Sequence, residues 1–170
     1  LSALAFSGHA NEEASRGFGQ MLSLCAPCPV AMGVCGTDPF LLRETSFSEW
    51  LEAGLEGLAN FPTIGLVDGF FRADLESSRL GFDQEAGALS LAADKGFFTI
   101  GFACRPEDAA LLAQSGCDAL ILHLGLTENS EPVGLIGNRL FPKYQDAVKG
   151  KGSSDPLLLL HADHVNSPED

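Results

Sequence analysis

The stretch "FFTIGFACRPEDAALLAQSGCDALILHLG", residues 97–125, decides the fold. It begins with an apolar run, 97–103, continues with a helical pattern, 105–116, and returns to an almost wholly apolar run, 117–125. Pro106 at an early helical position and acidic residues in the first turn are typical of a helix start. Apolar rather than alternating strands indicate a parallel sheet that helices cover. The stretch therefore predicts a βαβ unit.

The same alternation extends in both directions from this unit. Taken with it, the apolar runs predict five strands, near 30–35, 57–60, 97–103, 119–124 and 157–161. Further helical patterns cover 46–57, 83–96 and 138–150. Ser46 and Glu49 stand in capping-box spacing at the first of these, and Gly96 ends the second. We expect the strands to be parallel and to neighbour one another in chain order, with right-handed crossovers.

Two architectures place helices over a parallel sheet. An open doubly wound sheet normally has a glycine-rich phosphate loop, but "GVCGTDPF" (33–40) is not GxGxxG, and no GxxxxGK[ST] occurs. A TIM barrel instead places polar residues at the C-terminal end of one strand after another. Such residues here are Thr37, Asp38, Asn60, Cys104, Arg105, His123, His161, Asp163 and His164. The predicted fold class is therefore α/β, a TIM (β/α)8 barrel.

We expect this barrel to be partial. The chain has 170 residues, whereas a typical barrel of eight units has about 250. The pattern accounts for about five to six βα units. Residues 1–170 are therefore predicted to form a single partial TIM-barrel domain, a fragment of a longer chain that lacks the N-terminal strands and the last unit. The start, "LSALAFSGHANEE", has no initiator Met and does not have the pattern of a signal peptide.

Charge and cysteine content narrow the function. The formal net charge is −13, from 10 basic and 23 acidic residues, and such a chain repels a phosphate backbone, so we expect no nucleic-acid partner. No run of about 18 apolar residues occurs, so no membrane span is expected. Five cysteines, an odd number, suit a reducing compartment, and a cytoplasmic location is predicted. "CAPC" (25–28) is formally a CxxC motif, which we interpret as structural thiols rather than a redox or zinc site.

The segment "NFPTIGLVDGFFR" (60–72) fits neither an ordinary strand nor an ordinary helix. It is either a structural corner or the rim of a site. In the second interpretation Asn60 ends a strand at the catalytic face, and Asp68 starts a short helix. In the first, the phenylalanines at 61, 70 and 71 plug the top of the barrel, and Arg72 pairs with Asp68 or Asp74.

Four blocks of the sequence resemble a known family. In order, they are "GVCGTDPF" (33–40), "NFPTIGLVDGFFRADLE" (60–76), "LILHLGLT" (120–127) and "LLLHADHVNSPED" (158–170). They resemble the phosphoenolpyruvate hydrolase-like TIM-barrel family, whose members are also labelled TIM-barrel signal transduction proteins and whose domain occurs in a plant tobamovirus-resistance protein. This sequence departs from the family pattern at His9, where the family usually has Asp, and at "HADH" (161–164), where it has a His-Gly-Gly run. Ala162 and Asp163 would narrow the approach of an anion.

The resemblance implies kinship with barrels that act on phosphoenolpyruvate and pyruvate. In these a divalent metal chelates a 2-oxo acid or its enolate, so we expect a lyase or hydrolase that acts on a small carboxylate with Mg²⁺ or Mn²⁺. Asp38 is the best candidate for the metal, because it closely follows a strand and precedes Pro39. Its alternative role is an Asx-type turn cap.

Polar side chains at the strand ends are the remaining candidates. The predicted catalytic residues are His123, His161, Asn60 and Asp68, and the predicted substrate-binding residues are Thr37, Asn60, Arg72 and Thr127. Each histidine is a candidate general base or a donor to a carboxylate, and the alternative is a satisfied core residue. We expect Asp38, Asn60, His123 and His161 to converge on one pocket of about 300 Å³ or more.

A second class of function stays open. The chain is alternatively a non-catalytic signalling or binding domain that recognises a ligand or a protein partner. That alternative predicts a barrel mouth plugged by Phe70 and Phe71 and an exposed apolar patch elsewhere. The expected partners are a small carboxylate substrate and further copies of the full-length protein in a homo-oligomer.

Overall fold

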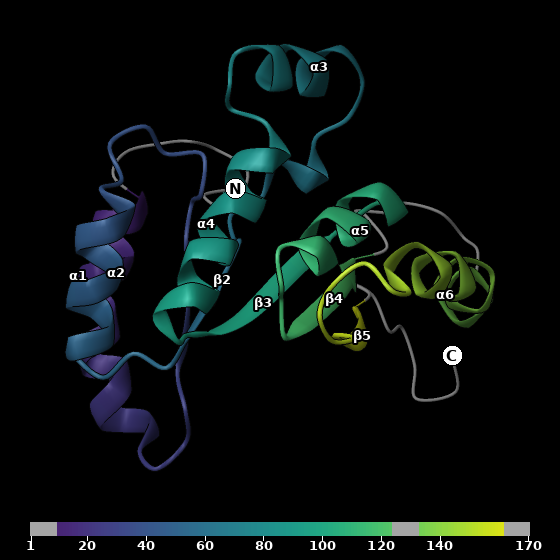
Figure 1. Ribbon diagram of the computed structural model, residues 1–170. Coiled ribbons are helices and arrows are strands. Elements are labelled where there is room, and N and C mark those ends of the chain that lie inside the picture. Colours follow the sequence, from purple (N-terminus) through teal and green to yellow (C-terminus); the bar gives the residue numbers. More distant parts are fainter. Residues whose placement is uncertain (1–9, 124–132, 162–170) are drawn as a thin grey trace.

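The computed structural model describes residues 10–123 and 133–161. A five-stranded sheet runs through it (Figure 1). The strands are β1 (Ala31–Gly33), β2 (Gly57–Ala59), β3 (Phe98–Ala103), β4 (Ala119–His123) and β5 (Leu157–His161). They neighbour one another in the order β1-β2-β3-β4-β5, and every pair is parallel. The predicted strands, their order and their parallel pairing are therefore confirmed.

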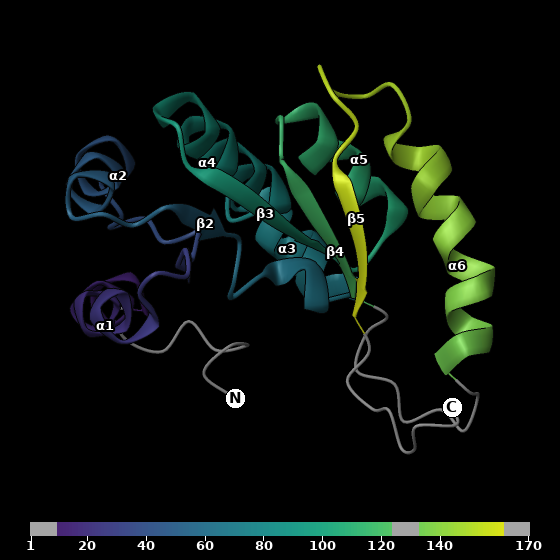
Figure 2. The ribbon, with the colours of Figure 1, turned by 90° about the horizontal axis from the view of Figure 1, so that it is seen from below.

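One helix precedes the sheet, and the other helices connect consecutive strands. They are α1 (Ala10–Cys25), α2 (Arg43–Glu52), the 3-10 helix η1 (Ile64–Leu66), α3 (Gly69–Ser77), α4 (Phe82–Lys95), α5 (Pro106–Gln114) and α6 (Val133–Val148). Figure 2 shows α2, α4, α5 and α6 in an arc around one side of the sheet. A parallel sheet with its helices on one side, each connecting neighbouring strands, is the arrangement of part of a TIM barrel.

Helix boundaries follow the sequence signals in part. Gly96 ends α4 with a left-handed backbone (φ 99°), and Pro106 opens α5, both as predicted. The capping box at Ser46 is wrong, because α2 already begins at Arg43 and the Ser46 N–H donates to the Leu42 carbonyl inside the first turn. Helix α6 also begins before its predicted start at 138. Helix α1 was not predicted from the sequence.

The core lies between the sheet and the helices. Leu58, Leu120 and Leu122 of the strands are fully buried, and Phe47, Leu89 and Leu112 of α2, α4 and α5 are buried in the same core. At Gly101 of β3 the packing is so close that a Cβ atom would lie 2.7 Å from the Leu112 Cδ1 atom. A larger residue here would force the side chains of Leu112 and Leu120 to shift.

The opposite face of the sheet is partly exposed. Phe98 on β3 is 51% exposed, and Leu157 and Leu159 on β5 are 60% and 45% exposed. The strand register places all three on the same face, because side chains alternate along a strand and Ile100, Ala119 and Leu157 lie side by side. This face carries large apolar side chains that no described helix covers. Among residues 10–123 and 133–161, no helix is long and apolar enough to cross a membrane.

A side chain joins β3 to β4 where these strands begin. The Asp118 Oδ2 atom accepts hydrogen bonds from the Thr99 N–H at 2.8 Å and from the Thr99 hydroxyl at 2.9 Å. The Asp118 N–H donates in turn to the Thr99 hydroxyl oxygen at 3.2 Å. This reciprocal pair fixes the alignment of the two strands at their N-terminal ends.

Candidate functional site

Asn60 stands directly after β2 and is fully buried. Its Oδ1 atom accepts a hydrogen bond from the Phe102 N–H at 2.6 Å, and its Nδ2 atom donates to the Phe102 carbonyl at 3.2 Å. The side-chain amide therefore pairs with β3 as the backbone of a strand residue would. The prediction that Asn60 marks the end of this strand is confirmed, and its amide prolongs the junction between β2 and β3.

Glu85 is the residue that the sequence analysis missed. It lies near the N-terminus of α4, is fully buried, and accepts three hydrogen bonds of 2.7 Å from Asn60 Nδ2, the Thr63 hydroxyl and the Ile64 N–H. Burial raises the pKa of Glu85 to about 7, against the lowering effect of these hydrogen bonds and of the Arg72 cation. One sequence signal was present, because Glu85 shares a helical face with the apolar residues Leu89 and Ala92.

Residues 61–68 turn the chain from β2 to α3. The Thr63 hydroxyl accepts from the Gly65 N–H at 2.9 Å and so caps η1. The Phe61 ring packs on Phe102 with ring centroids 5.1 Å apart. Asp68 occupies the N-cap position of α3, which confirms the predicted helix start, although its side chain makes no cap hydrogen bond. This segment is held by its own caps and by the Glu85 carboxyl.

Arg72 of α3 is buried and bonded on every side. Its guanidinium donates to the Ile64 carbonyl at 3.0 Å, to Asp108 of α5 at 3.0 Å and to Glu76 at 2.6 Å. It also lies 5.2 Å from the centre of the Phe82 ring. The predicted pairing with Asp68 or Asp74 is wrong, because the guanidinium pairs instead with Asp108 of α5 and with Glu76, one turn further along α3. Arg72 thus anchors the 3-10 turn to α5.

Asp38 lies in the loop after β1, and its carboxylate is oriented on both sides. Oδ1 accepts from the Phe40 N–H at 2.9 Å, which is the expected Asx-type turn, and Oδ2 accepts from Asn11 Nδ2 at 2.9 Å. Asn11 of α1 also bonds the N–H and the carbonyl of Cys35, at 2.8 and 3.1 Å. The nearby Thr37 is buried, with its hydroxyl 3.6 Å from the Cys35 sulfur.

The two carboxylate oxygens of Asp38 are ligands of the kind that Mg²⁺ prefers. Each of its oxygens accepts one hydrogen bond from protein and keeps further lone pairs for a cation. Within residues 10–123 and 133–161 no group of three His, Cys, Asp or Glu side chains could hold a metal. A metal at Asp38 would therefore be of the kind that takes one carboxylate and keeps several waters.

His123 and His161 close the last two strands of the sheet. They are direct partners in the parallel register, and their ring centroids lie 5.1 Å apart at an interplanar angle of 30°. His123 is buried, whereas His161 is exposed. The structure therefore brings the two predicted histidines together. Thr127, Ala162, Asp163 and His164 lie outside the described residues.

Four of the predicted residues lie in two groups of contacts. Asn60 and Arg72 join the Glu85 network, and the two histidines form a pair on β4 and β5. Neither of the two cavities described below is lined by Asp38, Asn60, His123 or His161. A single concavity around these four side chains stays a prediction.

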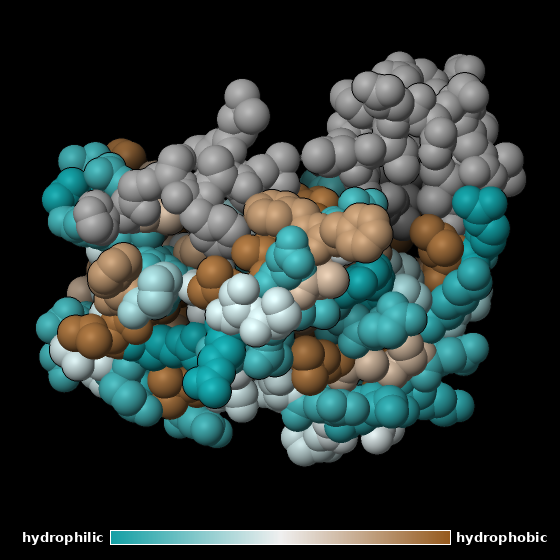
Figure 3. Space-filling view, turned by 90° about the horizontal axis from the view of Figure 1, so that it is seen from above, coloured by the Kyte–Doolittle hydropathy of each residue, from teal (hydrophilic) through white to brown (hydrophobic). Residues whose placement is uncertain are grey.

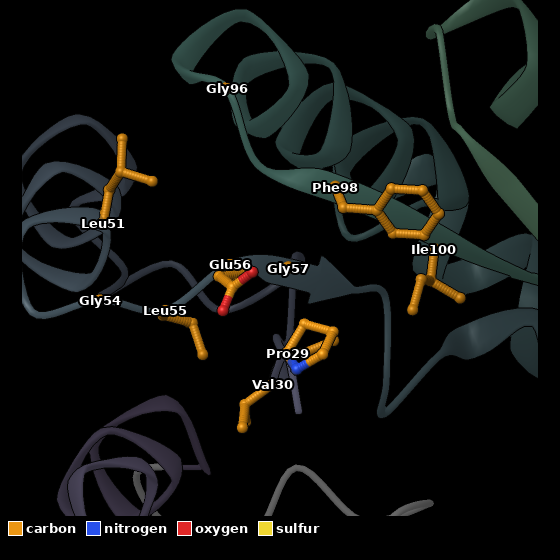
Figure 4. A pocket seen from close by; sticks show the side chains of 11 residues that line it. Pro29, Val30, Leu51, Gly54, Leu55, Glu56, Gly57, Gly96, Phe98 and Ile100 are labelled. Atoms are coloured by element: carbon orange, nitrogen blue, oxygen red, sulfur yellow. The ribbon is translucent and has the colours of Figure 1, made fainter. Parts of the chain in front are cut away.

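The larger cavity, of about 700 Å³, opens at the other end of the sheet. Its lining includes Ala31, Gly57 and Phe98, the first residues of β1, β2 and β3. Figure 4 shows Phe98 and Ile100 of β3 on one side of it and Leu51 of α2 on the other. In TIM barrels the chemistry takes place at the C-terminal ends of the strands, so this apolar groove is not the predicted site.

A smaller cavity, of about 350 Å³, lies beside the buried ion pair. It is lined by Arg72, Glu76, Phe82, Asp83, Arg105, Glu107, Asp108 and Leu111. Arg105 donates to both carboxylate oxygens of Asp108, at 3.0 and 3.2 Å, so both arginines that line this cavity are paired with acidic side chains of the lining.

The surface around α3 differs from the expected plug. Phe70 is 92% exposed and Phe71 is 60% exposed, so neither residue fills a barrel mouth. Figure 3 shows the molecule from the side on which α3 lies, where hydrophobic residues stand among hydrophilic ones. Only Phe61, half-buried on Phe102, packs as that interpretation predicted.

Comparison with known proteins adds an independent finding. The family described as phosphoenolpyruvate hydrolase-like matches residues 1–169. Two similar relatives from Solanum lycopersicum are the ToMV susceptible protein tm-1(GCR26) and the ToMV resistance protein Tm-1(GCR237), each 30% identical over 160 residues, which are 89% of this chain and 21% of the relative. An uncharacterized protein of Sinorhizobium fredii is 30% identical over 132 residues, 71% of this chain and 64% of that protein. The chain spans about a fifth of the length of the tomato relatives.

Proposed function

Because the chain belongs to the phosphoenolpyruvate hydrolase-like family, we propose that it acts on a small 2-oxo acid or enol phosphate at the C-terminal ends of its strands. One observation carries this proposal. The ends of β4 and β5 present two imidazoles side by side, with ring centroids 5.1 Å apart. Polar groups that meet at strand ends in this way are typical of barrel active sites.

The two histidines would divide the proton chemistry. His161 is exposed, so its imidazole would exchange a proton with the substrate or with water. His123 is buried beside it and would orient it or donate to a substrate carboxylate. Asp68 at the start of α3, Thr37 after β1, and Thr127 remain proposed contacts.

Asn60 and Arg72 would act by position. Both are buried, and their polar atoms already bond protein groups of β3, α4, α5 and η1. We give them the role of holding residues 60–66 at the edge of the site, because a rigid supporting shell is what keeps contact groups in register with a substrate.

A divalent metal, Mg²⁺ or Mn²⁺, would be held by Asp38 and would stabilise negative charge that develops on an enolate oxygen. Asn11 orients the Asp38 carboxylate from α1, and the Phe40 N–H fixes its other oxygen. The loop after β1 therefore presents one preset acidic group.

The test is turnover of phosphoenolpyruvate by the complete protein. Phosphoenolpyruvate and Mg²⁺ are added, and phosphorus NMR and an assay for pyruvate follow the substrate and its products. We expect inorganic phosphate and pyruvate in equal amounts, and a loss of at least about a hundredfold in rate in His161→Ala, the usual scale for a lost general acid or base. The surface variant Asp83→Asn serves as the control. The same rate in His161→Ala and wild type would contradict the proposal.

A specific observation favours a second candidate function, a binding domain. Phe70 and Phe71 present aromatic surface on α3, and two relatives carry names that refer to susceptibility and resistance to ToMV. Exposed aromatic side chains are enriched where proteins bind one another. In that case the double variant Phe70→Ser/Phe71→Ser would lose a protein partner while phosphoenolpyruvate turnover stays absent in every variant.

A further inference from the structure

The Glu85 carboxyl and the segment that covers it form one unit. All three groups that bond this carboxyl come from residues 60–64, namely the Asn60 amide, the Thr63 hydroxyl and the Ile64 N–H, each at 2.7 Å. Glu85 itself belongs to α4 and is fully buried. Any movement of this segment away from α4 would therefore bring water to the carboxyl.

Within residues 10–123 and 133–161, no cationic side chain bonds the Glu85 carboxyl directly. The Arg72 cation of α3 acts on Glu85 through its charge alone. Its guanidinium donates hydrogen bonds to the Ile64 carbonyl, Glu76 and Asp108 instead. Three hydrogen bonds compensate in part for lost hydration, but a buried charge without a counter-ion stays costly. The protonated carboxyl avoids this cost, and the Thr63 hydroxyl can serve either form because it both donates and accepts.

The other charged and titratable groups around Glu85 do not supply a counter-ion. Arg43 of α2 donates to the Gly36 carbonyl, at the loop that packs on the Glu85 backbone. Asp108 of α5 is negative and already pairs with Arg72. The thiols of Cys35 after β1 and Cys104 after β3 also sense the Glu85 charge, and burial raises the pKa of both thiols, which favours their neutral forms.

We propose that Glu85 is a proton-operated latch on residues 60–66: with a proton bound the segment stays on α4, and loss of the proton loosens it. Residues 60–66 follow β2 at the end of the sheet where the proposed site lies. The latch would therefore regulate how ordered this segment is and how easily a ligand reaches the site. The direction follows from linkage, because opening exposes the carboxyl to water, where ionisation is easier, and the pKa raised to about 7 puts the change near neutrality.

Hydrogen–deuterium exchange of the complete protein tests the latch without any ligand. After division by the intrinsic exchange rate, exchange in a peptide that covers 60–66 is expected to rise roughly threefold or more between about pH 6 and about pH 8. In Glu85→Gln the pH dependence should vanish, because this side chain has no proton to lose. Asp83→Asn, on the same turn of α4 but exposed, should keep the wild-type response. The same pH response in Glu85→Gln and wild type, or none in wild type, would overturn the proposal.

Infrared spectroscopy on wild-type protein covers the case in which Glu85→Gln does not fold. A carbonyl band of a protonated carboxylic acid should disappear as the pH rises through neutrality, and the absence of such a band at about pH 6 would also overturn the latch.

A second arm rests on the proposed function. An anion that binds beside the segment disfavours the negative charge of Glu85, so phosphoenolpyruvate binding at about pH 8 should take up a proton. Calorimetry in two buffers of different ionisation enthalpy measures this uptake, which should vanish in Glu85→Gln. Binding without uptake in wild type would contradict the latch. If phosphoenolpyruvate does not bind at all, the proposed function fails, and the exchange experiment still decides on the latch.

Discussion

The side chain of Asn60 and the backbone of Phe102 exchange two hydrogen bonds, of 2.6 and 3.2 Å, so that an amide group extends the pairing of β2 with β3. Replacement of Asn60 by Leu should lower the free energy of unfolding by about 2–4 kcal/mol, because the Phe102 N–H loses its side-chain acceptor and the Glu85 carboxyl loses one of its three hydrogen bonds. Urea unfolding measures the loss. Asn138→Leu, on the exposed surface of α6, is the control and should change stability by less than about 0.5 kcal/mol. Equal effects in the two variants would contradict this account.

The buried Arg72–Asp108 pair gives a second prediction. Arg72→Met should destabilise the fold by about 3 kcal/mol, because Asp108 then keeps only Arg105 and the Ile64 carbonyl keeps only the Val67 N–H as a donor. Arg72→Lys should restore only part of the loss, since an ammonium group cannot reach three acceptors in the fork geometry of a guanidinium. Thermal and urea unfolding measure both. Arg16→Met, which removes an exposed pair on α1, should cost no more than about 0.5 kcal/mol.

Stability should also depend on pH through Glu85. Its folded pKa of about 7 is above the ordinary value of 4.5, so the folded state holds the proton to higher pH than the unfolded state. The contribution to stability is therefore fully present below about pH 4.5 and is lost as the pH rises to about 7, with a total of order 3 kcal/mol. Urea unfolding from about pH 4.5 to about pH 8 should show this fall in wild type and in Asp83→Asn but not in Glu85→Gln. A parallel fall in all three proteins would contradict the assignment.

Cysteine reactivity provides a further check of the burial pattern. Burial raises the pKa of the Cys104 and Cys117 thiols to about 12, whereas Cys28 is exposed. Cys28 should react with a maleimide at least about tenfold faster than the two buried thiols, because thiolate and access both set the rate. Mass spectrometry of a time course identifies the sites, and denatured protein should show similar rates at every cysteine.

Asp38→Ala tests the metal proposal. The complete variant should keep its fold but lose Mg²⁺-dependent binding of phosphoenolpyruvate, which calorimetry with and without chelator detects. Asp38→Asn keeps one acceptor oxygen, and so one of the two hydrogen bonds, and removes the charge, so it should bind the ligand equally with and without Mg²⁺. Mg²⁺-dependent binding as strong as wild type in both variants would rule out Asp38 as the metal ligand.

The strands were predictable because each is a short apolar run bounded by turn residues, as in 97–103 and 119–124. Helix starts were less predictable. The side chains at Ser46 and Glu49 have the spacing of a cap, but packing of Phe47 and Trp50 in the core extends α2 back to Arg43. The contacts of the site depended on distance in three dimensions. Arg72 pairs with Asp108, 36 positions away, where sequence reasoning considered only its neighbours.

Glu85 escaped prediction for a related reason. An acidic residue near the N-terminus of a helix is ordinary, because it complements the helix dipole. The residue type and position of Glu85 therefore do not indicate a buried carboxyl. Only the register of α4 against β2 shows that this carboxyl turns inward to meet Asn60 and Thr63. Asn60 itself was singled out correctly as a strand-end residue, but the sequence did not show that its amide would bond β3.

Strand β3 forms hydrogen bonds with flanking side chains at both ends. Asn60, which follows β2, bonds it near its end, and Asp118, which precedes β4, bonds it near its start. Because these hydrogen bonds lie inside the sheet, the register of the central strands does not depend on the length of the connections between them. Insertions or deletions in those connections would leave the alignment of β2, β3 and β4 unchanged. The loops, and with them the ligand specificity, can therefore change during evolution while the alignment of the strands is kept.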